Sequence, residues 1–151
     1  MPPVLRRTPL WSMVGVLLLS LACDRMATVK RCKALARDVN PKLDAIDKVT
    51  RNRSAKSYRE ASRLYTELAG ALSRHLPPVD AAVSADPRGF ERSIREYQAM
   101  LLAASRLTSG LSQALAAGNQ ASAAVEIRQL EELSRSAKAA VKRIDSSCQP
   151  E

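Results

Sequence analysis

Apolar residues recur at steps of three and four in four segments of the chain, which is the spacing of one face of an α-helix. The stripes run through residues 29–46, 58–76, 90–115 and 127–148. Polar or proline-containing stretches separate them, and no run alternates apolar and polar residues as a half-buried strand would. The pattern therefore predicts an all-α protein.

Proline, glycine and asparagine mark the expected bends and ends of these helices. Pro41 lies inside the first stripe, but the register continues across it, which predicts one kinked helix. Pro77-Pro78 stops the second helix, and Asp86-Pro87 predicts an N-cap and first position for the third. Ser109-Gly110 predicts a weak point or kink inside the third helix. Gly118-Asn119 predicts a left-handed end followed by the cap of the fourth.

Four amphipathic helices, three of them joined by short links, predict an antiparallel up-and-down four-helix bundle over residues 29–149. In such a bundle the first and last helices are neighbours. The mature chain has the length of one ordinary domain. Tyr58, Tyr65 and Tyr97 lie on inner stripes, where we expect core packing rather than a ligand cage.

An uncharged run precedes the bundle, from Leu10 to Ala22, behind Arg6 and Arg7. Its 13 residues would make a helix of roughly 20 Å, shorter than the roughly 30 Å core of a bilayer. This arrangement is typical of a secretory signal peptide covering residues 1–22. Arg6-Arg7 also raises export by the twin-arginine route, although the residues around that pair differ from the usual signal.

The residues Ser20-Leu21-Ala22-Cys23 resemble the lipobox of bacterial lipoproteins, although Ser20 and Leu21 depart from its commonest pattern. The resemblance, confined to about the first two dozen residues, implies that Cys23 receives diacylglycerol and that residues 23–28 form a short tether. It implies a location in the bacterial cell envelope, facing the periplasm or the exterior. Asp24 resembles a signal for retention in the inner membrane. The alternative is cleavage by ordinary signal peptidase, which leaves a secreted protein with a free Cys23.

The chain has three cysteines, and exported proteins seldom leave one unpaired. Lipidation of Cys23 would leave Cys32 and Cys148, which lie on apolar stripes at the start of the first helix and the end of the last. An up-and-down bundle brings both to one end, so we expect a disulfide between them. Two buried free thiols are the alternative.

Positive charge is concentrated in the first half of the mature chain. Removal of Arg6 and Arg7 lowers the formal net charge from +9 to +7, and residues 24–63 hold twelve Lys or Arg against five Asp or Glu. Ten of these cations form two groups. The membrane-side group is Arg25, Lys30, Arg31, Lys33 and Arg37; the basic tip is Lys48, Arg51, Arg53, Lys56 and Arg59.

The membrane-side group suits anionic lipid headgroups or a solvated helix face. The basic tip suits an acidic envelope protein or another polyanion as partner. Nucleic acid is not an expected partner, because the aromatic platform of single-strand binders is missing. Glu126, Glu131 and Glu132 alternate with Arg128 and Arg135 at helical spacing, which predicts surface ion pairs.

Catalytic and metal-binding patterns are absent from the sequence. His75 is the single histidine, and the chain has no glycine-rich phosphate loop and no C-x-x-C. We therefore expect no enzyme activity, no metal and no cofactor. Two functions remain: a membrane-anchored scaffold or docking domain, and a small-ligand or sensor bundle. Alanine-rich stripes favour the first, because small residues let helices approach closely and leave little cavity.

Acylation of Cys23 is directly testable. The protein should partition with membranes and incorporate a clickable fatty acid during growth, whereas Cys23→Ser should neither mature nor take up the label. A wild-type protein that stays unlabelled would contradict lipidation and favour the secreted alternative.

Overall fold

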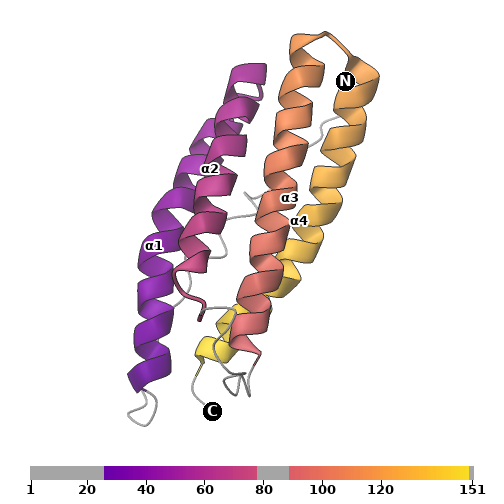
Figure 1. Ribbon diagram of the computed structural model, residues 1–151. Helices are drawn as coiled ribbons and strands as arrows, with labels where there is room; N and C mark the ends of the chain where they lie inside the picture. The colour runs from indigo at the N-terminus through magenta and orange to yellow at the C-terminus, as the bar shows by residue number, and fades with distance from the viewer. Residues whose placement is uncertain (1–25, 78–88, 150–151) are drawn as a thin grey trace.

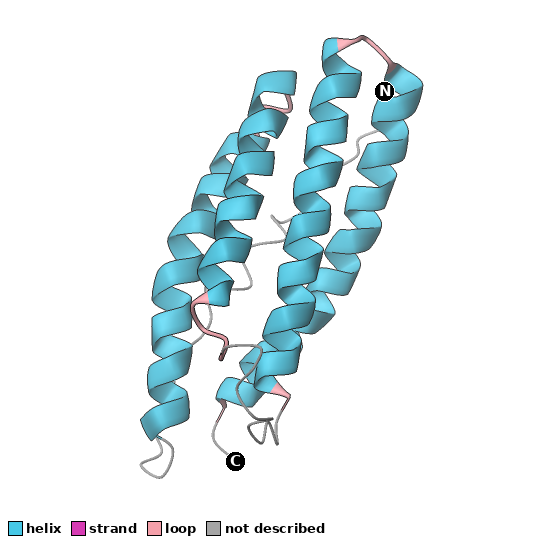
Figure 2. Ribbon diagram, viewed as in Figure 1, coloured by secondary structure: helices cyan, strands magenta, loops and turns pink. Residues whose placement is uncertain are grey.

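Residues 26–77 and 89–149 are described by the computed structural model, and they form a four-helix bundle in which successive helices run in opposite directions (Figure 1). The helices are α1 (Met26–Thr50), α2 (Ala55–Ser73), α3 (Phe90–Ala116) and α4 (Gln120–Cys148). Helices and short loops account for these two ranges, without a strand (Figure 2). The predicted fold class is thus confirmed. The signal peptide, Cys23, Arg25 and Asp86-Pro87 lie outside the described residues.

The apolar stripes form the core. The largest fully buried side chains come from α1, α2 and α3, and they include Leu43, Ile46, Leu68, Leu72, Ile94 and Leu101. Full burial of such a side chain stabilises the fold by roughly 1.5–3 kcal/mol. A smaller cluster of Leu111, Ala114 and Ala123 joins α3 to α4. Figure 1 shows that this hairpin extends past the turn between α1 and α2.

Small residues and hydrogen bonds join α2 to α3. The Ser62 hydroxyl donates to the Ser105 carbonyl at 2.8 Å, and the Ser105 hydroxyl donates to the Ser62 carbonyl at 2.9 Å. Further along, the Gln98 amide donates to the Ala69 carbonyl at 2.8 Å. A hydroxyl can reach the neighbouring backbone only where two helices lie close, so α2 and α3 form a fixed central pair.

The helix ends at Gly118 and Asn119 have the caps that the sequence predicts. Gly118 has φ +66°, and the amide of Asn119 donates to the Ala114 carbonyl, which together make a Schellman end for α3. The Asn119 side chain then accepts from the Ser122 amide and caps α4. Ser54 caps α2 in a reciprocal arrangement with Ser57. Helix α1 is continuous across Pro41, as predicted.

Two details of the prediction were wrong. Helix α2 ends at Ser73 rather than running to Pro77, and the amides of Arg74, His75 and Leu76 continue it as a turn with bonds three residues back. Helix α3 begins at Phe90, after Gly89 in the left-handed conformation, rather than at Pro87.

Helix α3 is continuous through Gly110. A Cβ there would lie 2.6 Å from a carboxylate oxygen of Glu126, so the glycine leaves room for the end of this α4 side chain.

Helices α1 and α4 are neighbours, but they touch at few places. Their firm connection is the Cys32–Cys148 disulfide, with Cα atoms 6.0 Å apart and both side chains in the core. This is the pairing that the cysteine count and the bundle topology predict. Toward the other end the seam between α1 and α4 opens, and α4 exposes Val125 and Ile127 there.

The disulfide closes a loop with a sequence separation of 116, for which chain entropy predicts about 4–5 kcal/mol of stabilisation. We expect Cys148→Ser to lower the melting temperature by roughly 10 °C or more. Circular dichroism melts with and without reductant measure the effect. Reductant should lower the wild-type melting temperature and leave that of Cys148→Ser unchanged; a wild type insensitive to reductant would contradict the bridge.

Candidate functional site

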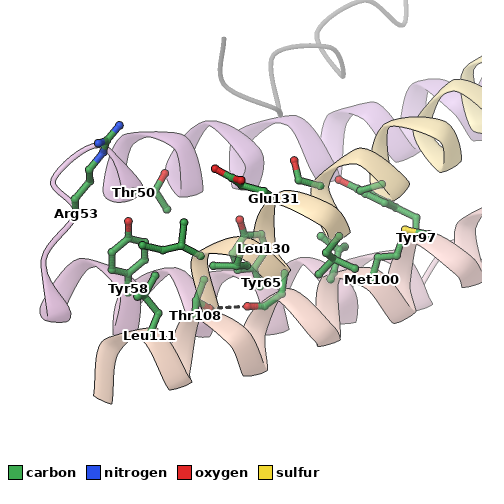
Figure 3. Close-up of a pocket in the computed structure, with 16 residues that line it drawn as sticks. Thr50, Arg53, Tyr58, Tyr65, Tyr97, Met100, Thr108, Leu111, Leu130 and Glu131 are labelled. Atoms are coloured by element: carbon green, nitrogen blue, oxygen red, sulfur yellow. Dashed lines mark hydrogen bonds between the residues drawn. The ribbon is translucent and has the colours of Figure 1, made fainter. Parts of the chain in front are cut away.

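A cleft opens where α1 and α4 diverge. Its volume is about 280 Å³, close to the lower end of the roughly 300–1,000 Å³ typical of ligand pockets. Residues from all four helices or their turns line it: Thr50, Arg53, Tyr58, Tyr65, Tyr97, Met100, Leu101, Ala104, Thr108, Leu111, Ile127, Leu130, Glu131, Leu133, Ser134 and Ala137. Figure 3 shows the cleft extending from Arg53 at one end to Tyr97 at the other.

Three tyrosines form much of the cleft wall. Tyr65 and Tyr97 belong to the core, as predicted, yet both also face the cleft, so their packing role and a ligand-contact role coincide. Burial raises the pKa of Tyr97 well above its ordinary value. Burial also raises the pKa of Tyr58, although the Arg53 charge acts in the opposite direction. Both phenols are therefore neutral at physiological pH.

Charged side chains occur at the cleft margin. Arg53 reaches it from the α1–α2 turn, and Glu131 reaches it from α4 (Figure 3). Arg53 has φ +49°, a left-handed conformation that L-residues adopt at a cost of about 1 kcal/mol. The turn that fixes this conformation also sets the direction of the Arg53 side chain. The Thr108 hydroxyl donates to the Ala104 carbonyl at 2.8 Å, so its hydrogen bond is made within α3.

The sequence did not identify the cleft. Alanine-rich stripes led us to expect little cavity, but the α4 stripe places Ile127, Leu130 and Ser134 beside the opening rather than in tight contact with α1. Ser134 was the one residue in the sequence that could have indicated a cleft. It is a small polar residue in the middle of an apolar stripe, so it fills little space opposite the tyrosines.

The expected ion pairs on α4 do not form. Within the described part of the chain, none of the salt bridges joins Glu126, Glu131 or Glu132 to Arg128 or Arg135. Glu126 packs against Gly110 instead. Glu131 remains exposed at the cleft margin.

All five residues of the basic tip lie on or around the α1–α2 turn, but they are not equivalent. Arg51 forms a salt bridge with Asp47 one helical turn earlier. Lys48, Lys56 and Arg59 are exposed, and in the described residues none of them has an ion-pair partner. Arg53 differs again because it lines the cleft.

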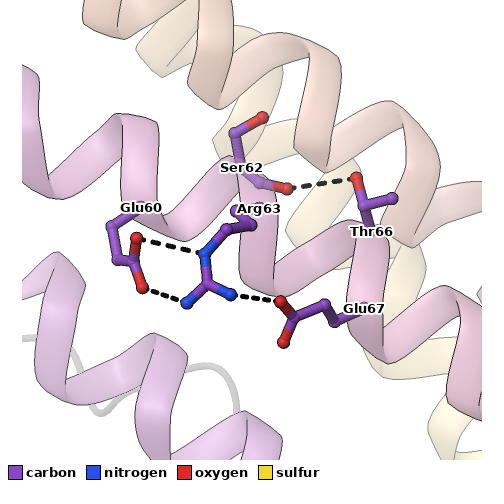
Figure 4. A network of polar contacts seen from close by, with 5 residues as sticks. All are labelled: Glu60, Ser62, Arg63, Thr66 and Glu67. Atoms are coloured by element: carbon purple, nitrogen blue, oxygen red, sulfur yellow. Dashed lines mark hydrogen bonds and ion pairs between the residues drawn. The ribbon is translucent and has the colours of Figure 1, made fainter.

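The next cation along α2 is neutralised. Arg63 pairs with Glu60 and with Glu67, so its guanidinium lies between two carboxylates, and Figure 4 shows both contacts beside the Ser62–Thr66 hydrogen bond. The Glu60 hydrogen bond raises the pKa of Arg63, and the same bond lowers the pKa of Glu60. Arg63 therefore adds little to the positive charge that the basic tip presents to a partner.

One residue of the membrane-side group, Arg31, makes contacts within the fold. Arg31 donates to the Glu91 carboxylate at 3.2 Å and to the His75 carbonyl at 3.3 Å, and its guanidinium lies 5.1 Å from the Phe90 ring centroid. These contacts join α1 to the end of α2 and the start of α3. Lys30, Lys33 and Arg37 are exposed, which is compatible with both functions considered for this group.

His75 has a structural contact on the same end of the bundle. Its Nε2 lies 2.9 Å from Oδ2 of Asp38 on α1, and its side chain is 12% exposed. The His75 hydrogen bond, assisted by the charges of His75 and Arg74, lowers the pKa of Asp38. In residues 26–77 and 89–149, no three His, Cys, Asp or Glu side chains are grouped closely enough to hold a metal ion.

No helix in the described part of the chain combines the length and apolar character needed to cross a bilayer. No protein-family model matches the chain, and neither does any curated protein or solved structure.

The Asp38–His75 contact predicts a defined acid dependence. Because the folded pKa of Asp38 is lower than its ordinary 3.8, the carboxylate stabilises the fold above that pH, and the contribution is lost as pH falls through the folded pKa. Asp38→Asn should melt below the wild type at pH 7, and the difference should shrink below pH 3.8. Asp44→Asn on the exposed face of α1 is the matched control; equal effects of the two variants would contradict the assignment.

Proposed function

We propose that the protein is a membrane-anchored envelope lipoprotein, attached through Cys23, whose non-enzymatic helical bundle is a docking surface for another envelope component. The lipobox-like residues and the preceding apolar run support the anchor. The basic tip is the proposed docking surface, and its partner is an acidic envelope protein or polyanion. Asp24, which resembles a retention signal, favours the inner membrane as the location.

One observation carries this proposal: the unneutralised cations of the tip lie far from the proposed anchor. Helix α1 begins at Met26, shortly after Cys23 in the sequence, and its 25 residues correspond to roughly 37 Å along the helix axis. Charges held at that distance are beyond the roughly 8–10 Å screening length of a membrane surface. They can attract a soluble or membrane-embedded acidic partner without competition from headgroups.

The positive charges at the start of α2 favour docking, rather than stabilisation of the fold, as the role of the basic tip. Lys56 and Arg59 lie on the first turns of α2, where cations oppose the helix dipole rather than stabilise it. No acidic residue occupies the first turn of α2. The arrangement gives little stability, and it increases the positive potential that a partner would meet.

A second function, ligand binding within the bundle, is favoured by the cleft. Its apolar walls, neutral phenols and few polar groups resemble the composition of small-molecule sites. The two surfaces share Arg53, whereas Lys56 and Arg59 of the basic tip do not line the cleft.

The docking function can be tested by charge reversal. A photo-crosslinking residue at Asn52, in the exposed turn, should form an adduct with the partner in intact cells. Lys56→Glu with Arg59→Glu should remove that adduct, because a reversed charge repels an acidic surface. Lys138→Glu with Lys142→Glu, the same charge change on exposed positions of α4, should leave it. An adduct that survives the tip reversal would contradict electrostatic docking.

A further inference from the structure

We propose that the cleft between α1 and α4 binds an anionic amphiphile with a single acyl chain, the chain lying along the apolar walls and the carboxylate or phosphate head at Arg53. This inference rests on the second proposed function, ligand binding in the bundle, and it names the ligand class.

The walls suit a hydrocarbon chain. Met100, Leu130, Leu133 and Ile127 supply flexible apolar surface, and Ile127 is 41% exposed although it is a large hydrophobic residue. An apolar chain would bury this surface, and each buried methylene contributes about 0.8 kcal/mol. The volume of about 280 Å³ lies near the lower limit for ligand pockets, which favours one chain over the two of a diacyl lipid.

The Arg53 end suits an anionic head. Arg53 lines the cleft and has no ion-pair partner in the described structure. Its guanidinium can bind a carboxylate or a phosphate through two parallel hydrogen bonds. Tyr58 lies at the same end (Figure 3), and as a neutral phenol it can donate a further hydrogen bond. The cations around the turn increase the attraction for an anion.

Glu131 determines which way the amphiphile lies. Its carboxylate is at the α4 margin, between Arg53 and Tyr97 in Figure 3, where it would repel an anionic head. The head is therefore held at the Arg53 end and the chain passes Glu131 toward Tyr97. The two charges predict opposite effects on anion binding when each is removed.

The experiment uses clickable, diazirine-bearing ligands of one chain length and four head groups: a fatty acid, a lysophosphatidic acid, an alcohol and an amine. The full chain is purified in its exported form and kept free of detergent, in nanodiscs if its lipid anchor is attached. Photolabelled peptides are mapped by mass spectrometry, and the readout is the concentration that half-saturates labelling of residues 97–111 and 127–137.

Three pairs of variants test the contacts. Arg53→Asn removes the cation while asparagine tolerates the left-handed turn, and Arg59→Gln removes a neighbouring cation outside the cleft. Glu131→Gln removes the repelling carboxylate, and Glu132→Gln is its exposed neighbour. Ser134→Phe fills the cleft, whereas Ser136→Phe adds the same ring on the exposed face of α4.

We expect the two anionic ligands to label the cleft at lower concentration than the alcohol, and the amine to label it least. Arg53→Asn should weaken anion binding by up to about fivefold, the upper end for exposed charge pairs, without changing the binding of the alcohol. Glu131→Gln should tighten anion binding, Ser134→Phe should abolish all labelling of the cleft, and the matched controls should behave as wild type.

The outcomes separate this inference from the function on which it rests. Equal cleft labelling by all four head groups would overturn the anionic head while ligand binding stands. Labelling that Ser134→Phe does not reduce, or the absence of cleft labelling by every ligand, would overturn both. Selective labelling by lysophosphatidic acid identifies a phosphate head, and selective labelling by the fatty acid identifies a carboxylate.

Discussion

The Cys32–Cys148 disulfide is the constraint on which the arrangement of the bundle depends. Helix α1 packs on α2, and α3 packs on both α2 and α4, but α1 and α4 make few contacts of their own. The covalent bond therefore closes the ring of four helices at one end. A ring closed at one end can diverge at the other, and the cleft occupies the region where it does so.

The two ends of the bundle have different chemistry as a result. At the disulfide end, the side chains of Arg31, His75 and Asp38 make contacts within the protein that join three helices. At the turn end, Lys56 and Arg59 lack such partners, and Arg53 reaches the cleft. Arg31 thus holds helices together at the disulfide end, where Lys30, Lys33 and Arg37 remain exposed. The tip cations Lys56 and Arg59 are available for recognition. Both proposed functions are located at the turn end.

Sequence periodicity predicted the helices and the bundle because burial repeats with the helical period, as at Leu43, Leu68 and Leu101. Gly118 and Asn119 were equally predictable, since Gly118 adopts a left-handed backbone conformation and the Asn119 side chain accepts from an amide three residues later. The start of α3 was not, because Gly89 caps it without a side chain that marks a helix end. The cleft was also missed: periodicity says which face turns inward, but it does not say how closely two inward faces meet. Arg53 was identified only as a surface cation for the same reason.

The disulfide holds α1 against a bundle in which α1 packs only weakly on α4. Amide hydrogen exchange of the oxidised and the reduced protein measures this dependence. Reduction should lower the protection of α1 amides, above all near Cys32, while α3 amides between Tyr97 and Leu111 keep theirs, because the central α2–α3 pair does not depend on the bond. Unchanged protection of α1 after reduction, or equal loss in α1 and α3, would contradict it.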